Sequence, residues 1–258
     1  MTNKILLSFD VEEFDLPEEY NFGTVPENDK YNVSGNGMKT VMDVIEAEKV
    51  PVTFFVTANF ATHFPELLQR MVKSGGEIAS HGVSHSSFSV PDLAKSKEIL
   101  QKLSGQDIIG FRMARLAPVK KQEILNAGYL YESSLNPVWL PGRYNHFRAP
   151  LLPFQENNEL WQYPVSAVPG VRFPLFWLSF KTLPESLYHL FTKFTVARTH
   201  YFNLYTHPWE YNAEARNPQW KIPGYITKHA GPELAERLTH LIRLLKTIGE
   251  FKTFREDF

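Results

Sequence analysis

The sequence contains no cysteine. Disulfide bonds, thiol catalysis and cysteine-ligated zinc are therefore excluded. Any metal site in this chain has to be built from imidazole and carboxylate side chains. The chain has nine histidines and 28 aspartates and glutamates from which to build one.

The sequence also lacks a charge excess and a long apolar run. Its net charge is −1, without a long basic or acidic block, which argues against a nucleic-acid partner. No segment approaches the roughly 18 apolar residues that span a bilayer. Residues 1–4 lead directly into an apolar run, without the features of a signal peptide. We therefore expect a cytoplasmic location.

The chain does contain a repeated alternation of short apolar runs and helical patterns, which predicts parallel strands joined by helices. The predicted strands are 5–9, 52–56, 77–79, 108–111, 129–131, 201–205 and 251–254. The predicted helices are 38–49, 65–73, 91–103, 120–126 and 232–248. With no internal repeat and no clear boundary, we predict a single α/β domain over residues 1–258.

Two segments interrupt this rhythm. Residues 17–37 are polar and rich in turn-forming residues, which predicts a loop. Residues 137–200 predict an irregular insertion rich in proline and aromatic residues. Its most aromatic part, 173–194, is interpreted as core and barrel cover. A sugar-stacking surface or a weak contact with a membrane surface is the alternative.

Two histidines, His81 and His85, follow the third predicted strand. On a helical turn, residues four positions apart share a face, so the two imidazoles could converge on one point. Neutral imidazole binds zinc and neighbouring first-row metals. The competing interpretation is an ordinary polar turn. The residues that follow the other predicted strands favour the metal site.

Charged residues follow the other predicted strands in the same way. In α/β sheets and barrels, ligands bind at the carboxyl ends of the strands. A water-activating metal site needs two or three protein ligands, a base, an acid and an orienting charge. The strand ends supply this set with Asp10, Glu12, His81, His85, Arg112, Glu132 and His207. For Asp10 the alternative is a solvated acidic loop, and for His207 it is a buried structural histidine.

These motifs resemble the polysaccharide deacetylase superfamily, carbohydrate esterase family four. The resemblance rests on Ser8 to Asp10, Val52 to Val56 and Glu77 to His85, with looser matches at 110–112 and 128–134. Residues 204–210, with the sequence LYTHPWE, resemble the exopolysaccharide-biosynthesis branch.

The resemblance implies a distorted (β/α) barrel of about seven parallel strands. It also implies a hydrolase that removes N- or O-acetyl groups from a sugar or glycan. One divalent metal ion is implied, with zinc expected and cobalt, nickel or manganese as alternatives. By motif position, the metal ligands would be Glu12, His81 and His85. Asp10 would be the base, His207 the acid and Arg112 the residue that orients Asp10, with the backbone N–H of Arg115 stabilising the oxyanion.

The chain departs from the family pattern at three places. Val11 stands where many members have an aspartate ligand, so Glu12 is the expected substitute, with Glu13 or Asp15 competing. The Arg-x-Pro segment lacks its proline and carries a second charge at Arg115. Glu132 replaces the usual aspartate, as a supporting site residue or as part of a structural Glu–Arg pair.

Three functions fit these residues. The first is metal-dependent deacetylation of an acetylated sugar or glycan precursor, with the N-acetyl group as the expected target. The second is glycan binding by a catalytically disabled protein on the same fold, motivated by Val11 and Arg115. Retention of the acids and histidines argues against it. The third is deformylation or another amide hydrolysis at the same metal site.

Overall fold

The computed structural model describes residues 2–140, 144–156 and 159–258. It contains a nine-stranded sheet and a separate two-stranded hairpin, β6 (Trp139–Leu140) with β7 (Tyr144–Asn145). The large sheet consists of β1 (Lys4–Val11), β2 (Thr53–Val56), β3 (Glu77–Ser80), β4 (Gly110–Phe111), β5 (Tyr131–Glu132), β8 (Phe154–Glu156), β9 (Leu160–Gln162), β10 (Tyr201–Thr206) and β11 (Glu250–Lys252).

The sheet has the order β10-β1-β2-β3-β4-β5-β9-β8, and β11 pairs with β1. Every pairing is parallel except that of β8 with β9. Next to β9, Ser166 binds back to β10, because its backbone N–H donates to Asn203 O at 3.0 Å and its Oγ accepts from Asn203 N at 2.8 Å. The curled parallel sheet confirms the predicted α/β barrel.

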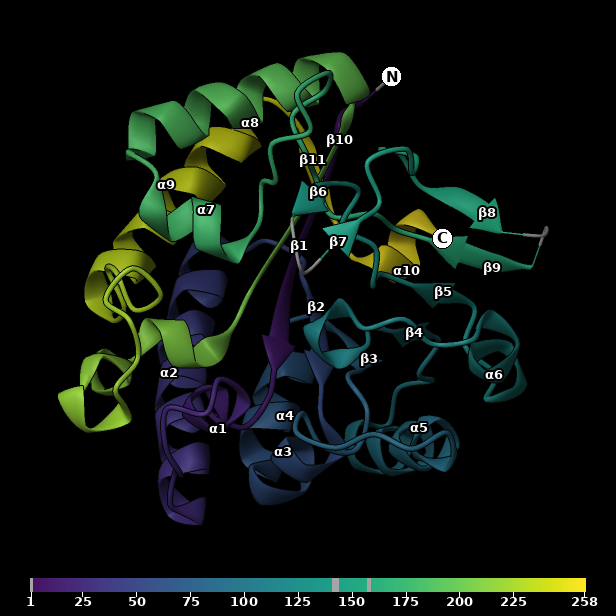
Figure 1. Ribbon diagram of the computed structural model, residues 1–258. Coiled ribbons are helices and arrows are strands. Elements are labelled where there is room, and N and C mark those ends of the chain that lie inside the picture. The colour runs from purple at the N-terminus through teal and green to yellow at the C-terminus, as the bar shows by residue number, and fades with distance from the viewer. Residues whose placement is uncertain (1, 141–143, 157–158) are drawn as a thin grey trace.

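Helices surround this sheet (Figure 1). Helices α2, α9 and α8 pack in succession along one side, and α3, α4 and α5 along another. The helices are α1 (Leu16–Glu19), α2 (Glu27–Glu48), α3 (Ala58–His63), α4 (Pro65–Lys73), α5 (Pro91–Ser104), α6 (Lys121–Asn126), α7 (Trp177–Thr182), α8 (Glu185–Thr199), α9 (Pro232–Lys246) and α10 (Phe254–Asp257).

Strand β1 sets the position of the site. Its odd-numbered residues, such as Leu7 and Val11, join the core between sheet and helices, whereas Leu6 packs inside the barrel against Phe55. Successive residues of a strand point to opposite faces. Asp10 therefore shares the inner face with Leu6.

The helix predictions need three corrections. The predicted loop 17–37 is wrong, since α1 and the first half of α2 occupy most of it. Helix α3 was missed altogether. The predicted irregular segment 137–200 includes residues 141–143 and 157–158, which lie outside the described residues, but its second half contains α7 and the fifteen-residue α8.

Within the described residues, no helix combines the length and hydrophobicity that crossing a lipid bilayer requires.

Candidate active site

Three buried side chains at the carboxyl end of the sheet form a cluster of candidate metal ligands. Atoms of Glu12, His81 and His85 all lie within 4.8 Å of one another. Glu12 Oε2 is 3.1 Å from Nε2 of His81 and 3.3 Å from Nε2 of His85. The two imidazoles thus point their Nε2 atoms at the same carboxylate.

The other ring nitrogen of each histidine faces an acceptor. Nδ1 of His81 lies 2.8 Å from the backbone oxygen of Arg112, and Nδ1 of His85 lies 2.7 Å from Oδ1 of Asp15. A proton on Nδ1 satisfies both contacts and leaves the Nε2 lone pairs for a metal. Burial raises the pKa of Glu12, so a bound cation would stabilise its anionic form. This donor set fits a zinc-type divalent ion with open positions.

The three acids that competed for the ligand position separate in the structure. Only Glu12 joins both histidine Nε2 atoms. Glu13 instead accepts a hydrogen bond from Thr57 Oγ1 at 2.9 Å. Asp15 acts on the far side of His85, as described above. The sequence contains the carboxylate but carries no signal for this supporting position, because Asp15 and His85 are 70 residues apart.

The histidine pair is not on a helical turn, so that premise of the sequence analysis is wrong. Residues 81–85 form a loop after β3, and Gly82 has a φ of +83°. The carbonyls of Gly82 and Val83 accept from the first N–H groups of α3, Ala58 and Asn59, each at 3.0 Å. Helix α3 thereby fixes the loop that carries both imidazoles.

Arg112 anchors the next part of the site. Its guanidinium is fully buried. Nη1 donates to Asp10 Oδ1 at 2.6 Å and to Ser8 Oγ at 2.9 Å, while Nε and Nη2 donate to the backbone oxygen and Oγ of Ser133. It also stacks 3.9 Å from the ring centroid of Phe55. These contacts fix both the charge and the direction of Asp10.

Asp10 is held as an anion. Burial acts to raise its pKa, but Arg112, His81 and His207 together lower the pKa below its ordinary value. An ionised carboxylate beside the candidate metal ligands can accept a proton from water.

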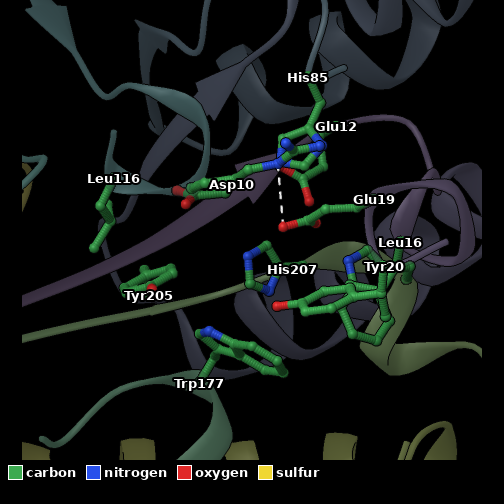
Figure 2. A pocket seen from close by; sticks show the side chains of 12 residues that line it. Asp10, Glu12, Leu16, Glu19, Tyr20, His85, Leu116, Trp177, Tyr205 and His207 are labelled. Carbon is green, nitrogen blue, oxygen red and sulfur yellow. Dashed lines mark ion pairs between the residues drawn. The ribbon is translucent and has the colours of Figure 1, made fainter. Parts of the chain in front are cut away.

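His207 follows β10 and faces the ligand cluster across the pocket (Figure 2). Its Nδ1 lies 2.8 Å from Glu210 Oε1, which also accepts from the His207 backbone N–H. The ring stacks on Trp209, and the edges of Trp177 and Tyr205 complete its surroundings. A proton on Nδ1 leaves Nε2 available for the reacting group.

The pocket between these groups is small, with a volume of about 30 Å³, room for about two water molecules. Arg115 and Leu116 form part of its wall, in consecutive left-handed conformations with φ of +59° and +52°. Such strain in residues other than glycine costs about 1–3 kcal/mol each and clusters at functional sites. The Arg115 side chain pairs with Glu19 at 3.1 Å, so its backbone is what can face a substrate.

The structure places Glu132 elsewhere. Its side chain is buried in a neighbouring cavity, where it pairs with Lys121 and accepts from Gln162 Nε2 at 2.8 Å. The ion pair of Glu132 is with Lys121, whereas Arg112 binds Asp10, Ser8 and Ser133, so a Glu–Lys pair stands in place of the Glu–Arg pair. The remaining predicted site residues gather around one pocket or support its walls.

Comparisons with known proteins relate part of this chain to a family. A model of the polysaccharide deacetylase family matches residues 28–127. The chain is 42% identical over 55 residues to a chitooligosaccharide deacetylase of Bradyrhizobium sp. (strain ANU 289), covering 21% of this chain and 23% of the relative. The chain thus spans about a quarter of the length of the curated relatives that it matches.

Solved structures share the fold across nearly the whole chain. A probable polysaccharide deacetylase from Pseudomonas aeruginosa PAO1 aligns with a TM-score of 0.70 and 15% identity, covering 98% of this chain and 88% of the other. The allantoinase Puue aligns with a TM-score of 0.69 and 14% identity, over the same shares. The assignment to the exopolysaccharide branch stays a prediction. The chain thus matches the polysaccharide deacetylase family over residues 28–127 and shares the fold of these solved structures over nearly its whole length.

Proposed function

We propose that this protein is a metal-dependent hydrolase that removes acetyl groups, chiefly N-acetyl groups, from a sugar within a glycan or glycan precursor. The observation that carries the proposal is the convergence of Asp10, Glu12, His85 and His207 on one pocket. The match of residues 28–127 to the polysaccharide deacetylase family supports deacetylation, and the buried Glu–His–His cluster supports a metal requirement. A cytoplasmic location stays a prediction.

Glu12, His81 and His85 would hold the ion, with zinc as the first candidate and cobalt, nickel or manganese as alternatives. When bound, such an ion polarises a carbonyl and lowers the pKa of water to about 7. The protein's own contribution begins with Asp10. Its carboxylate accepts one proton from the attacking water, whose oxygen forms the new bond to the acetyl carbon. Arg112 keeps Asp10 anionic and aimed at that water.

The leaving amine needs a proton as the C–N bond breaks. His207 lies across the pocket from Asp10, and its Nε2 would donate that proton, giving acetate and a free amino sugar. The backbone N–H of Arg115, in the strained wall segment, would donate to the oxyanion. Glu132 has no part in these steps, because it belongs to the neighbouring cavity.

A catalytically disabled glycan-binding protein would need no such set. Asp10 has its guanidinium partner, His207 has its carboxylate partner, and both candidate metal-binding imidazoles have acceptors at Nδ1. This complete support for proton transfer and metal binding favours the enzyme.

The test combines metal content with turnover. Elemental analysis of purified protein should find one divalent ion per chain, and triacetylchitotriose should release acetate. His81→Ala and His85→Ala should each lose the ion and the turnover. His240→Ala is a matched control, since His240 is a half-exposed surface histidine paired with Glu185. Full metal occupancy in the His81→Ala/His85→Ala double variant would refute the metal site, and a metal-loaded wild type without deacetylation would refute the activity.

A further inference from the structure

A lysine is buried behind the candidate catalytic histidine. Lys181, on α7, has a fully buried side chain and forms an ion pair with Glu210. Glu210 is also fully buried and binds His207 through its other oxygen. Lysine is almost never fully buried unless it is paired, so this position needs an explanation.

The surroundings of Lys181 suit an ammonium group. Its Nζ donates to the backbone oxygen of Ile226 at 2.7 Å. It also lies 4.7 Å from the ring centroids of both Trp177 and Trp209, within the range of cation–π attraction. The Glu210 carboxylate, the Ile226 carbonyl and the two tryptophan rings together replace the water that would otherwise stabilise the Lys181 ammonium group.

Glu210 connects this lysine to the histidine. One of its oxygens accepts from Nδ1 and the backbone N–H of His207, and the other faces Lys181. Burial acts to raise the pKa of Glu210, but Lys181 and His207 hold the pKa below its ordinary value. An ionised Glu210 can only accept hydrogen bonds, so it requires the proton on Nδ1 of His207.

We propose that Lys181 is a positioning residue for the acid step, which through Glu210 holds His207 with its Nε2 toward the leaving amine. This inference rests on the proposed function. It also gives the segment around α7 a second role. The same helix supplies Trp177 to the pocket wall. The aromatic segment 173–194, interpreted from the sequence as barrel cover, therefore also forms the side of the site that carries His207.

A purely structural role explains the lysine less well. A buried ion pair is often no more stable than apolar residues of the same volume. Nothing in the packing of Trp177 against Trp209 requires a charge between the rings. The direct chain from ammonium to carboxylate to imidazole does require one.

The first test compares two substrates. Release of an amine from triacetylchitotriose needs a proton donor, whereas 4-nitrophenyl acetate releases a phenolate that leaves without protonation. Lys181→Met should lower kcat for the amide by about tenfold or more, less than the roughly 10²–10⁴ expected for His207→Ala. KM, metal content and ester turnover should change by less than about twofold. Lys228→Met is the control, since Lys228 is an exposed lysine that binds the end of α7 through Thr182 O.

A double-variant cycle tests the route of the effect. If Lys181 acts through Glu210, adding Lys181→Met to Glu210→Gln should cause no further loss of amide kcat. Equal losses for amide and ester, or an unchanged amide kcat in Lys181→Met, would overturn the proposal. So would full additivity of the two variants.

A spectroscopic readout separates this inference from the proposed function. In ¹⁵N-labelled protein, the hydrogen-bonded Nδ1–H of His207 should give a downfield proton signal that disappears in His207→Ala. Lys181→Met should shift or broaden that signal, and Lys228→Met should leave it unchanged. This outcome is readable even if the wild type hydrolyses no acetylated sugar. A signal identical in wild type and Lys181→Met would refute the positioning role.

Discussion

The carbonyl oxygen of Pro208 occupies the space in which a side chain on Gly37 would begin. A Cβ added to Gly37 would lie only 1.9 Å from that oxygen. Gly37 is inside helix α2, where a glycine costs about 0.5–1 kcal/mol relative to alanine. The close approach explains the glycine, because it seats the loop that carries His207 directly on the helix.

We therefore expect Gly37→Ala to displace this loop. The overpacking should lower the free energy of unfolding by about 1–3 kcal/mol and should reduce kcat, because His207 precedes Pro208. Chemical denaturation and deacetylation assays measure the two effects.

Gly35→Ala is the matched control on the same helix. Its Cβ would lie 2.6 Å from the tip of the Phe64 ring, a side chain rather than backbone, so we expect a smaller loss of stability, offset in part by the higher helix propensity of alanine, and no change in kcat. If both variants were equally stable and equally active, the backbone contact with Pro208 would have no role in placing His207.

Much of the barrel could be predicted from the sequence because its strands are buried on both faces. Runs such as Ile5 to Phe9 and Val52 to Val56 have the length and continuous hydrophobicity that are typical of a central strand in a parallel sheet. The prediction failed at the first half of α2, where turn-forming residues such as Pro26 and Gly35 indicated a loop that extended to Gly37. Those glycines serve close packing against Phe64 and Pro208, and a tertiary contact of this kind leaves no local signal.

The site also has a part that could be predicted from the sequence and a part that could not. Residues directly after strands could be named from sequence because parallel strands end at one edge of the sheet. Their supporting partners could not. Asp15 reaches a histidine 70 positions away, and Lys181 reaches the acid loop from a different helix. For Glu132 the strand end indicated the right edge of the sheet, but it could not show that the side chain lies in the neighbouring cavity beside Lys121 and Gln162.

Asp15 should tune metal affinity without being a ligand. Its hydrogen bond to Nδ1 of His85 orients the ring and makes Nε2 a better donor, and loss of such a partner typically weakens metal binding by about 10–100-fold. We expect Asp15→Asn to lose the ion to a competing chelator at a chelator concentration about 10–100-fold lower than wild type requires. Glu13→Gln is the control, because Glu13 is a neighbouring buried acid that binds Thr57 instead. Equal metal affinities for the two variants would contradict the assignment.

Glu132 should matter for stability rather than for chemistry. Glu132→Gln removes the partner of Lys121 but keeps a polar group beside Gln162. We expect a loss of about 1–3 kcal/mol in unfolding free energy, with kcat on triacetylchitotriose within about twofold of wild type. A large fall in kcat at unchanged stability would show that Glu132 is a supporting residue of the site.

The pair of Glu210 with Lys181 should also show in acid stability. The folded-state pKa of Glu210 lies below its ordinary value of 4.5. A depressed pKa contributes stability that is fully present above the ordinary value and is lost as the pH falls through the folded value. The difference in unfolding free energy between wild type and Glu210→Gln should therefore shrink below about pH 4.5. Urea titrations at pH 7, 5, 4 and 3 measure it, and a constant difference would show that Glu210 is not preferentially ionised in the folded state.

Asp10 and Glu12 should show opposite signatures, although both project from the inner face at the end of β1. Asp10 is bound by Arg112, which fixes it as a base, whereas Glu12 faces the two histidine Nε2 atoms, which makes it a ligand. Asp10→Asn should keep the metal and the substrate affinity but lose turnover. Glu12→Gln should weaken metal binding, and excess metal should partly restore its activity, because the base and the acid are still in place. Elemental analysis and kinetics with added zinc distinguish the two. If Asp10→Asn lost the ion while Glu12→Gln kept both ion and activity, the two roles would have to be exchanged.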